Sequence, residues 1–314
     1  MDQAVKKLIE QLNTILIGKE DVIKKIVSNI LAGGNILLED MPGVGKTIIA
    51  KALAKSIAKD ARNTEIHFSR IQATPDLLPY DITGVDIYDN KKNKFAFKPG
   101  PIFTDILLAD ELNRTTPKVQ SALLQAMAEK EVTIGVNTYK LPEIFFVIAT
   151  QNPVETEGTY PLPAAQLDRF TCCLKIGYPD VEDEIIILDK GKSENRLVNL
   201  KSVIDVKSIL KIRNGVKKIE INNKLHRVIV NICNTTRNHK DIRLGLSTRA
   251  ALMMIDILRA NAFLSEREYV IDQDIVDLSG DVWAHRLILL NPQLNARDMI
   301  DKIARNEIRK IIKA

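Results

Sequence analysis

The sequence predicts an α/β fold in which helices cover a parallel sheet, followed by a smaller α-helical domain. Three observations support this prediction. Short apolar runs alternate with segments of helical periodicity in the first part of the chain. A glycine-rich turn joins the first of these runs to a helix, and beyond residue 180 the segments are mainly amphipathic helices. We therefore expect an α/β core over residues 1–179 and a helical domain over residues 180–314.

The spacing of apolar residues gives the expected elements in order. Five strand-like runs form the predicted parallel sheet, at residues 35–39, 66–71, 105–109, 144–149 and 172–176. The core helices are expected at residues 4–31, with a break near Gly18, and at 46–58 and 116–129. Polar turns between β-favouring residues predict two inserted β-hairpins, at 85–97 and 132–139. The later helices are expected at 181–190, 201–211, 222–237, 248–263, 272–290 and 296–312.

The composition is that of a globular protein without a concentrated basic surface. Its 45 basic and 40 acidic residues are interleaved and give a net charge of +5, so we do not expect a nucleic-acid partner. The first residues hold no apolar signal core, and no run of about 18 apolar residues is present. We expect a cytoplasmic protein without a membrane segment. The three cysteines, in apolar surroundings, are expected to be small buried hydrophobic residues.

A phosphate-binding loop is the strongest motif in the chain. The segment Met41-Pro42-Gly43-Val44-Gly45-Lys46-Thr47 follows a strand and opens a helix that continues through Ile48. Glycines let backbone N–H groups surround a phosphate, and the helix N-terminus adds partial positive charge. Lys46 is expected to reach the β- and γ-phosphates of ATP, and Thr47 to bind Mg²⁺ through its hydroxyl. Asp40 departs from the general motif, which has glycine at that position.

A pair of carboxylates forms the second motif. The apolar run Ile106-Leu107-Leu108-Ala109 ends in Asp110 and Glu111. Both side chains are expected at the carboxyl edge of the sheet, beside the phosphate loop. Asp110 is expected to hold Mg²⁺ through water, and Glu111 to orient and polarise an attacking water molecule.

A further polar residue follows the strand-like run at 144–149. Asn152 in Gln151-Asn152-Pro153 can face the γ-phosphate if this strand lies in the centre of the sheet. It can equally begin a turn, since Asn-Pro favours turns, and the spacing alone favours the turn.

Several longer segments carry a family resemblance. They include Lys98-Pro99-Gly100-Pro101-Ile102-Phe103 and Gln166-Leu167-Asp168-Arg169-Phe170, and also residues 17–20, 37–47, 70–79, 108–114, 120–127, 146–153 and 157–163. With these segments the chain resembles the MoxR-type AAA+ ATPases over most of residues 15–180, and more thinly beyond. The resemblance implies a P-loop NTPase core of the AAA+ type with two hairpin inserts, a helical lid, and a ring, usually hexameric, with ATP between its subunits.

The resemblance also implies roles for individual residues. Asn152 matches the sensor-1 position, and Arg169 the arginine finger that contacts the nucleotide of a neighbouring subunit in trans. Arg249 matches the sensor-2 arginine, which is expected to reach phosphate from above, although Thr248 replaces the usual proline before it. Ile17 and Gly18 resemble the adenine-contacting turn, and an ordinary helix break explains them equally well. Arg114 also matches the family, with no clear role.

The function that the resemblance implies is chaperone-like remodelling or maturation of partner proteins, often ones with a von Willebrand factor A domain. Two alternatives stay open on the sequence. ATP can drive an assembly or binding switch with little turnover, or the chain can be a nucleic-acid-associated motor. The complete set of catalytic positions argues against the switch, and the lack of a basic stripe with interleaved aromatic residues argues against the motor.

Overall fold

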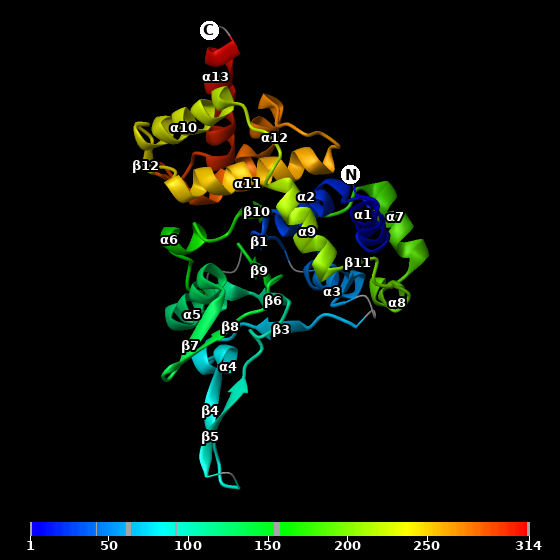
Figure 1. Cartoon of the computed structure of the whole chain (residues 1–314). Coiled ribbons are helices and arrows are strands. Elements are labelled where there is room, and N and C mark those ends of the chain that lie inside the picture. Colours follow the sequence, from blue (N-terminus) through cyan, green and yellow to red (C-terminus); the bar gives the residue numbers. More distant parts are fainter. Residues whose placement is uncertain (1, 42, 61–63, 92, 154–157, 313–314) are drawn as a thin grey trace.

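The computed structural model describes residues 2–41, 43–60, 64–91, 93–153 and 158–312, and it contains the predicted five-stranded parallel sheet (Figure 1). The strand order is β10-β1-β9-β6-β3. Their bounds are Ile36–Glu39 for β1, Phe68–Gln72 for β3, Ile106–Asp110 for β6, Phe146–Gln151 for β9 and Cys172–Leu174 for β10. All neighbouring pairs are parallel, so the fold predicted from the sequence is confirmed.

The register of the strands brings their carboxyl ends to one edge of the sheet. Glu39 at the end of β1 lies opposite Gln151 at the end of β9, and Asp110 at the end of β6 lies opposite Gln72 at the end of β3. The phosphate loop follows β1, Glu111 follows Asp110 at the end of β6, and Asn152 follows β9. Chain segments that are far apart in sequence are therefore presented together at this edge.

Helices cover both faces of the sheet because successive strand residues point to opposite sides. Ile36, Ile148 and Cys172 belong to the apolar cluster that includes helices α1 (Gln3–Ile15), α2 (Glu20–Ala32) and α3 (Lys46–Ser56). Leu37 and Cys173 belong to the other cluster, with helix α5 (Pro117–Glu129). All three cysteines are buried, as expected, and burial raises the pKa of each thiol.

Both predicted hairpins are present. Strands β4 (Gly84–Asp89) and β5 (Lys94–Pro99) form the longer one, which follows the short helix α4 (Pro79–Thr83) and projects away from the helical end of the molecule (Figure 1). Strands β7 (Glu131–Ile134) and β8 (Asn137–Lys140) form the shorter one. The two hairpins touch through Phe97 and Tyr139, whose rings stack with centroids 4.1 Å apart.

The C-terminal part is helical, as predicted, but two helix boundaries differ from the prediction. The helix expected at 201–211 is α9 (Val206–Val216), because the Asp205 side chain accepts a hydrogen bond from Ser208 N and caps the helix there. The helix expected at 272–290 is α12, which ends at Trp283. The next residues form a 3₁₀ turn (Ala284–Arg286) and strand β13 (Ile288–Leu289), which pairs with β12 (Ile242–Leu244).

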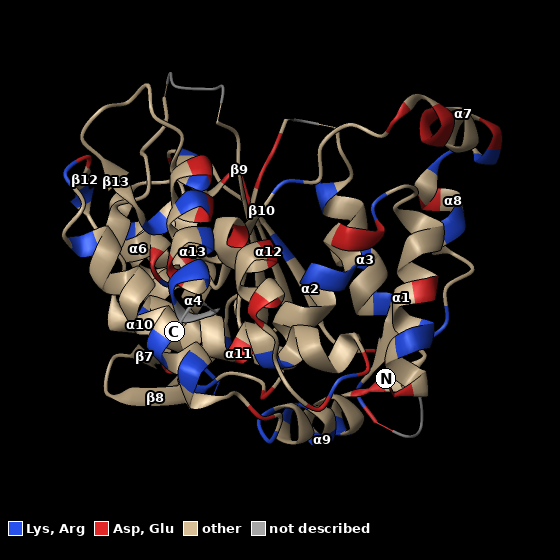
Figure 2. Cartoon of the chain, turned by 90° about the horizontal axis from the view of Figure 1, so that it is seen from above, with Lys and Arg blue, Asp and Glu red and all other residues tan. Residues whose placement is uncertain are grey.

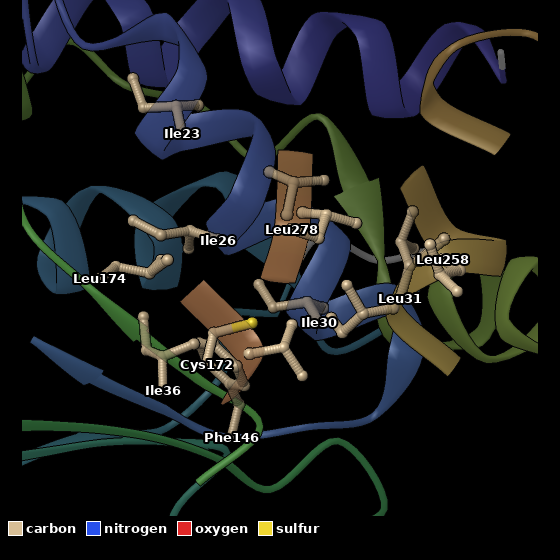
Figure 3. Close-up of a cluster of buried hydrophobic side chains, with 14 of the residues drawn as sticks. Ile23, Ile26, Ile30, Leu31, Ile36, Phe146, Cys172, Leu174, Leu258 and Leu278 are labelled. Carbon is tan, nitrogen blue, oxygen red and sulfur yellow. The ribbon is translucent and has the colours of Figure 1, made fainter. Parts of the chain in front are cut away.

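The helices after residue 180 contact the α/β part in two places. Helix α8 (Ser193–Leu197) packs on α3, helix α9 packs on α2, and β11 (Ile204–Asp205) pairs with β2 (Ile57–Ala58). Helices α10 (Asn223–Arg237), α11 (Thr248–Leu264), α12 (Asp272–Trp283) and α13 (Ala296–Ile312) form a second group, and α7 spans Val181–Lys190. Figure 3 shows Leu258 of α11 and Leu278 of α12 near Ile30 and Leu31 of α2. Helix α2 of the α/β part therefore also packs against this second group of helices.

The outer surface carries both signs of charge. Figure 2 shows lysine and arginine mixed with aspartate and glutamate over the helices seen from that side. Within the described ranges, no helix is long and apolar enough to cross a membrane.

Candidate nucleotide-binding site

The phosphate loop lies between β1 and α3 in the conformation that its glycines allow. Gly43 and Gly45 have φ angles of +86° and +96°, which L-residues with side chains rarely adopt. A Cβ atom at Gly45 would also lie only 2.9 Å from Cδ1 of Leu16. Helix α3 begins at Lys46, so its first N–H groups are available to an anion. Pro42 of the predicted site lies outside the described residues.

A cavity of about 300 Å³ opens beside this loop. It brings together residues from four separate segments: Gly43, Gly45, Lys46, Thr47, Ile48, Asp110, Glu111, Asn152 and Glu194. A lysine, a helix N-terminus and the oxygen donors of Thr47 and Asp110 suit a polyphosphate with Mg²⁺, because Mg²⁺ prefers oxygen ligands and is held together with substrate phosphates. The residues present therefore fit Mg²⁺ and a nucleotide phosphate. Glu194 was not predicted as a lining residue.

The Asp110 carboxylate is held on both of its oxygens. Thr150 donates its hydroxyl to Oδ1 at 2.7 Å, and Arg70 donates Nη2 to Oδ2 at 2.6 Å. The same Thr150 hydroxyl oxygen accepts a hydrogen bond from Glu111 N at 2.8 Å. Neither Thr150 nor Arg70 was predicted as a site residue. The available signal was that both residues lie on strands next to β6, Arg70 on β3 opposite Leu108 and Thr150 near the carboxyl end of β9.

Glu111 occupies a strained backbone position. Its φ angle is +57°, which is uncommon for a residue other than glycine and is typical of functional sites. Its carboxylate accepts a hydrogen bond from Gln72 Nε2 at 3.1 Å and forms an ion pair with Arg114 at 3.2 Å. In this chain Arg114 therefore contacts the predicted catalytic carboxylate.

Asn152 directly follows β9, whose position between β1 and β6 is central in the sheet. It is almost fully buried and lines the same cavity as Lys46 and Glu111. The placement fits the sensor-1 interpretation, which needs a central strand, rather than a turn at the surface.

Asp40 stands where the general motif has glycine, and its side chain braces the start of the loop. The carboxylate is buried and accepts hydrogen bonds from the backbone N–H groups of Ile176 and Gly177, the latter at 3.1 Å. Its backbone carbonyl accepts from Lys46 Nζ at 2.7 Å. Asp40 thus ties the phosphate loop to the segment that follows β10, a role that only the tertiary structure reveals.

Replacement of Asp40 by alanine is expected to destabilise the fold by about 1–3 kcal/mol, because the buried Ile176 N–H and the partly buried Gly177 N–H lose their acceptor. Asp40→Asn, which keeps one carbonyl oxygen as an acceptor, is expected to lose less. Denaturant unfolding of the two variants beside the parent chain measures the difference. Equal stability of Asp40→Ala and the parent chain would show that these hydrogen bonds contribute nothing.

A second cavity of about 360 Å³ shares Gly43, Gly45 and Ile48 with the first. Its other walls are largely apolar and include Ile15, Leu16, Ile17, Val44, Ile176, Pro179, Ile187 and Leu188. Apolar walls next to a phosphate site suit a flat base. Ile17 lines this cavity. Gly18, whose φ angle is +71°, has a different role. The Asp183 side chain lies so close to its backbone that a Cβ atom at Gly18 would overlap the Asp183 carboxylate.

Arg169 and Arg249 lie together but away from both of these cavities. They line a separate cavity of about 290 Å³ with Gly33 and Gly34, which precede β1, whereas the phosphate loop follows β1. The four residues of β1 separate the two sites by about 13 Å along the strand. The family resemblance implied that Arg249 reaches the phosphate from above. In the structure Arg249 lies instead beside Arg169, away from the phosphate loop of its own chain.

The cavity that holds the two arginines contains a third basic side chain. Lys130 lines it, and burial together with Arg213 lowers the pKa of this lysine to about 8. Arg249 is half exposed and lies 3.9 Å from the Asp168 carboxylate. Thr248 occupies the first position of α11, where proline is usual, and Ser247 caps the helix by accepting from Ala250 N. The helix that carries Arg249 therefore begins normally without the proline.

Comparisons with known proteins identify the family and agree with the fold. Residues 35–172 match the model of the ATPase family associated with various cellular activities, and residues 234–306 match the AAA lid domain. Among solved structures, a protein of Cytophaga hutchinsonii described as a candidate ATPase superposes with a TM-score of 0.86 at 38% identity, covering 96% of this chain and 93% of that one.

Two curated relatives cover most of the chain. The uncharacterised protein YeaC of Bacillus subtilis is 44% identical over 283 residues, which cover 90% of this chain and 86% of YeaC. Chaperone MoxR1 of Mycobacterium tuberculosis is 36% identical over 299 residues, which cover 91% of this chain and 76% of MoxR1.

Proposed function

The chain belongs to the MoxR-type AAA+ ATPases, and from this premise we propose that it hydrolyses ATP with Mg²⁺ at the interfaces between copies of itself. The observation that carries the proposal is that the residues expected to take part in hydrolysis form two groups, which lie apart from each other in one chain. The phosphate-loop cavity holds Lys46, Thr47, Asp110, Glu111 and Asn152, whereas Arg169 and Arg249 line a cavity at the opposite edge of the sheet. A complete site forms when a second copy of the chain places its Arg169 and Arg249 beside the phosphate loop of the first copy.

The chemistry follows from the charges that develop during phosphoryl transfer. Lys46 and the N-terminus of α3 bind the β- and γ-phosphates. Glu111 orients and polarises the attacking water, and Asn152 helps to fix that water against the γ-phosphate. Arg169 and Arg249 of the neighbouring copy neutralise the charge on the transferred group. Thr47 and Asp110 would hold Mg²⁺, which when bound would supply positive charge beside the phosphate oxygens.

The energy of hydrolysis is proposed to remodel or mature partner proteins in a chaperone-like manner, with a hexameric ring as the assembly. One curated relative is named a chaperone, which supports this role. Partners with a von Willebrand factor A domain are proposed because the family resemblance implies them. Glu111→Gln protein, which is expected to hold ATP without hydrolysing it, tests this proposal. The variant should retain a von Willebrand factor A protein when ATP is bound and should not retain it without ATP. Retention that is independent of ATP would contradict the proposal.

The enzymatic part is tested by phosphate release from ATP. The parent chain is expected to release phosphate with Mg²⁺ and to stop when the metal is chelated. Lys46→Ala is expected to lose ATP binding as well as turnover, because the cavity loses the positive charge that reaches the phosphates. Lys51→Ala, an exposed lysine on the same helix, is the matched control and should hydrolyse ATP normally. Unchanged ATP binding by Lys46→Ala would contradict the assignment of this site.

A further inference from the structure

A buried arginine in the helical part reaches back to the segment that carries Arg169. Arg286 is the last residue of the 3₁₀ turn after α12, and only 3% of its surface is exposed. Its guanidinium donates to Asp168 Oδ1 at 3.0 Å and to the carbonyl oxygens of Phe170 and Thr171. Burial lowers the pKa of Arg286, and the Asp168 carboxylate opposes this shift. One side chain therefore binds three of the four residues from 168 to 171.

The preceding residue strengthens the same connection. His285 Nε2 lies 3.2 Å from the carbonyl oxygen of Phe170. Phe170 itself is fully buried. Burial lowers the pKa of His285 well below its usual range, so the neutral ring can donate its Nε2 proton to this carbonyl. Two successive residues of the turn thus hold the backbone on the C-terminal side of Arg169.

Asp168 extends the connection to Arg249. Its carboxylate also accepts from the Ser247 hydroxyl, at 3.0 Å and 3.1 Å from its two oxygens. Ser247 caps helix α11, in whose first turn Arg249 lies. Asp168 therefore binds Arg286 on one side and the start of α11 on the other, and it is the immediate neighbour of Arg169.

We propose that Arg286 is a positioning residue that fixes Arg169 and Arg249 as one unit for delivery to the nucleotide of the neighbouring subunit. The inference deepens the proposed function and rests on it. Arg286 is too deeply buried to touch that nucleotide and acts through Asp168. A planar guanidinium suits the task, because its fork of donors serves a carboxylate and two carbonyls at once, which a lysine ammonium cannot do in the same geometry.

The position of Arg286 gives a prediction that a purely structural role does not make. Arg286 lines neither the phosphate-loop cavity nor the adjoining apolar cavity. Arg286→Lys and Arg286→Met are therefore expected to bind ATP with unchanged affinity and to hydrolyse it roughly 10²-fold more slowly, the usual effect of misplaced groups. The loss should fall on kcat, with KM nearly unchanged.

Mixing two inactive variants tests which half of the site fails. Arg286→Met protein keeps its own phosphate loop and offers misplaced arginines, whereas Glu111→Gln protein offers intact arginines and has a defective phosphate-loop site. A mixture of the two is expected to hydrolyse ATP well above the sum of the separate proteins. A mixture of Arg286→Met with Arg169→Ala is expected to stay inactive, since both lack the arginine half.

The Arg169→Ala and Glu111→Gln mixture is the reference. If it stays inactive, the proposed function fails at its trans arginine. If it regains activity but the Arg286→Met and Glu111→Gln mixture does not, the inference about Arg286 fails alone. Recovery in the Arg286→Met and Arg169→Ala mixture would also overturn that inference.

Two further variants guard against misfolding. Ser247→Gly removes the other donor to Asp168 while glycine keeps most of the capping effect, so it should show the same complementation with a smaller loss. Arg267→Lys is the matched control, because Arg267 forms a 2.6 Å ion pair with buried Asp274 in the same helical part and does not contact residues 168–171. It should hydrolyse ATP at the parent rate. A loss in Arg267→Lys equal to that in Arg286→Lys would overturn the proposal.

Discussion

Arg169→Ala is expected to lower the rate of ATP hydrolysis by roughly 10³-fold or more, the usual effect of removing an arginine finger. ATP binding should persist, because Arg169 lines neither cavity beside the phosphate loop of its own chain. The physical reason is the charge that develops on the transferred phosphoryl group, which a guanidinium neutralises only when it is in place at that moment. Single-turnover hydrolysis and equilibrium ATP binding, measured on the same protein, separate the two effects.

The control for this experiment is Arg243→Ala. Arg243 is an exposed arginine on β12 and lines none of the three cavities described above. The Arg243→Ala substitution should leave the rate of ATP hydrolysis unchanged, and this result would exclude a general effect of removing a positive charge. If Arg169→Ala hydrolyses ATP at the parent rate, Arg169 has no part in the chemistry.

Glu111→Gln is expected to lower hydrolysis by roughly 10²–10⁴-fold, because glutamine cannot accept a proton from the attacking water. Glutamine keeps the size of the side chain and an oxygen acceptor for Gln72 Nε2. The fold and ATP binding should therefore survive, and ATP should stay bound instead of turning over. Quantification of bound ATP and ADP after incubation with Mg²⁺ measures this result.

Glu10→Gln, an exposed glutamate on α1, is the matched control for Glu111→Gln and should hydrolyse ATP normally. Hydrolysis at the parent rate by Glu111→Gln would contradict its assignment as the residue that polarises water. Loss of ATP binding in that variant would instead show that Glu111 holds the nucleotide.

The sheet and the phosphate loop could be predicted from the sequence because their signals are local. Each strand is a short apolar run, and the glycines of the loop are needed at the positions where φ is positive. The acidic pair could be predicted for a related reason. Parallel strands bring their carboxyl ends to one edge, so Asp110 and Glu111 had to lie near Lys46 once all three followed strands.

Features that depend on tertiary contacts could not be predicted. Nothing local to Asp40 indicates that its acceptors serve Ile176 and Gly177, which are 136 and 137 residues away. The start of α9 depends on the Asp205 cap, and the end of α12 on a 3₁₀ turn whose Arg286 is buried against Asp168. The placement of Arg249 beside Arg169 likewise follows from the packing of the helical part. The division of the chain at residues 179 and 180 and the individual site roles stay predictions.

The central claim is that catalysis needs residues of two copies of the chain. The most direct measurement is the rate of ATP hydrolysis per subunit as a function of protein concentration, with oligomer size followed in parallel. The account predicts a rate per subunit that is low where the protein is monomeric and climbs as it assembles, because each phosphate loop then receives Arg169 of a neighbour. A constant rate per subunit across a range in which sizing shows the chain passing from monomer to oligomer would contradict it.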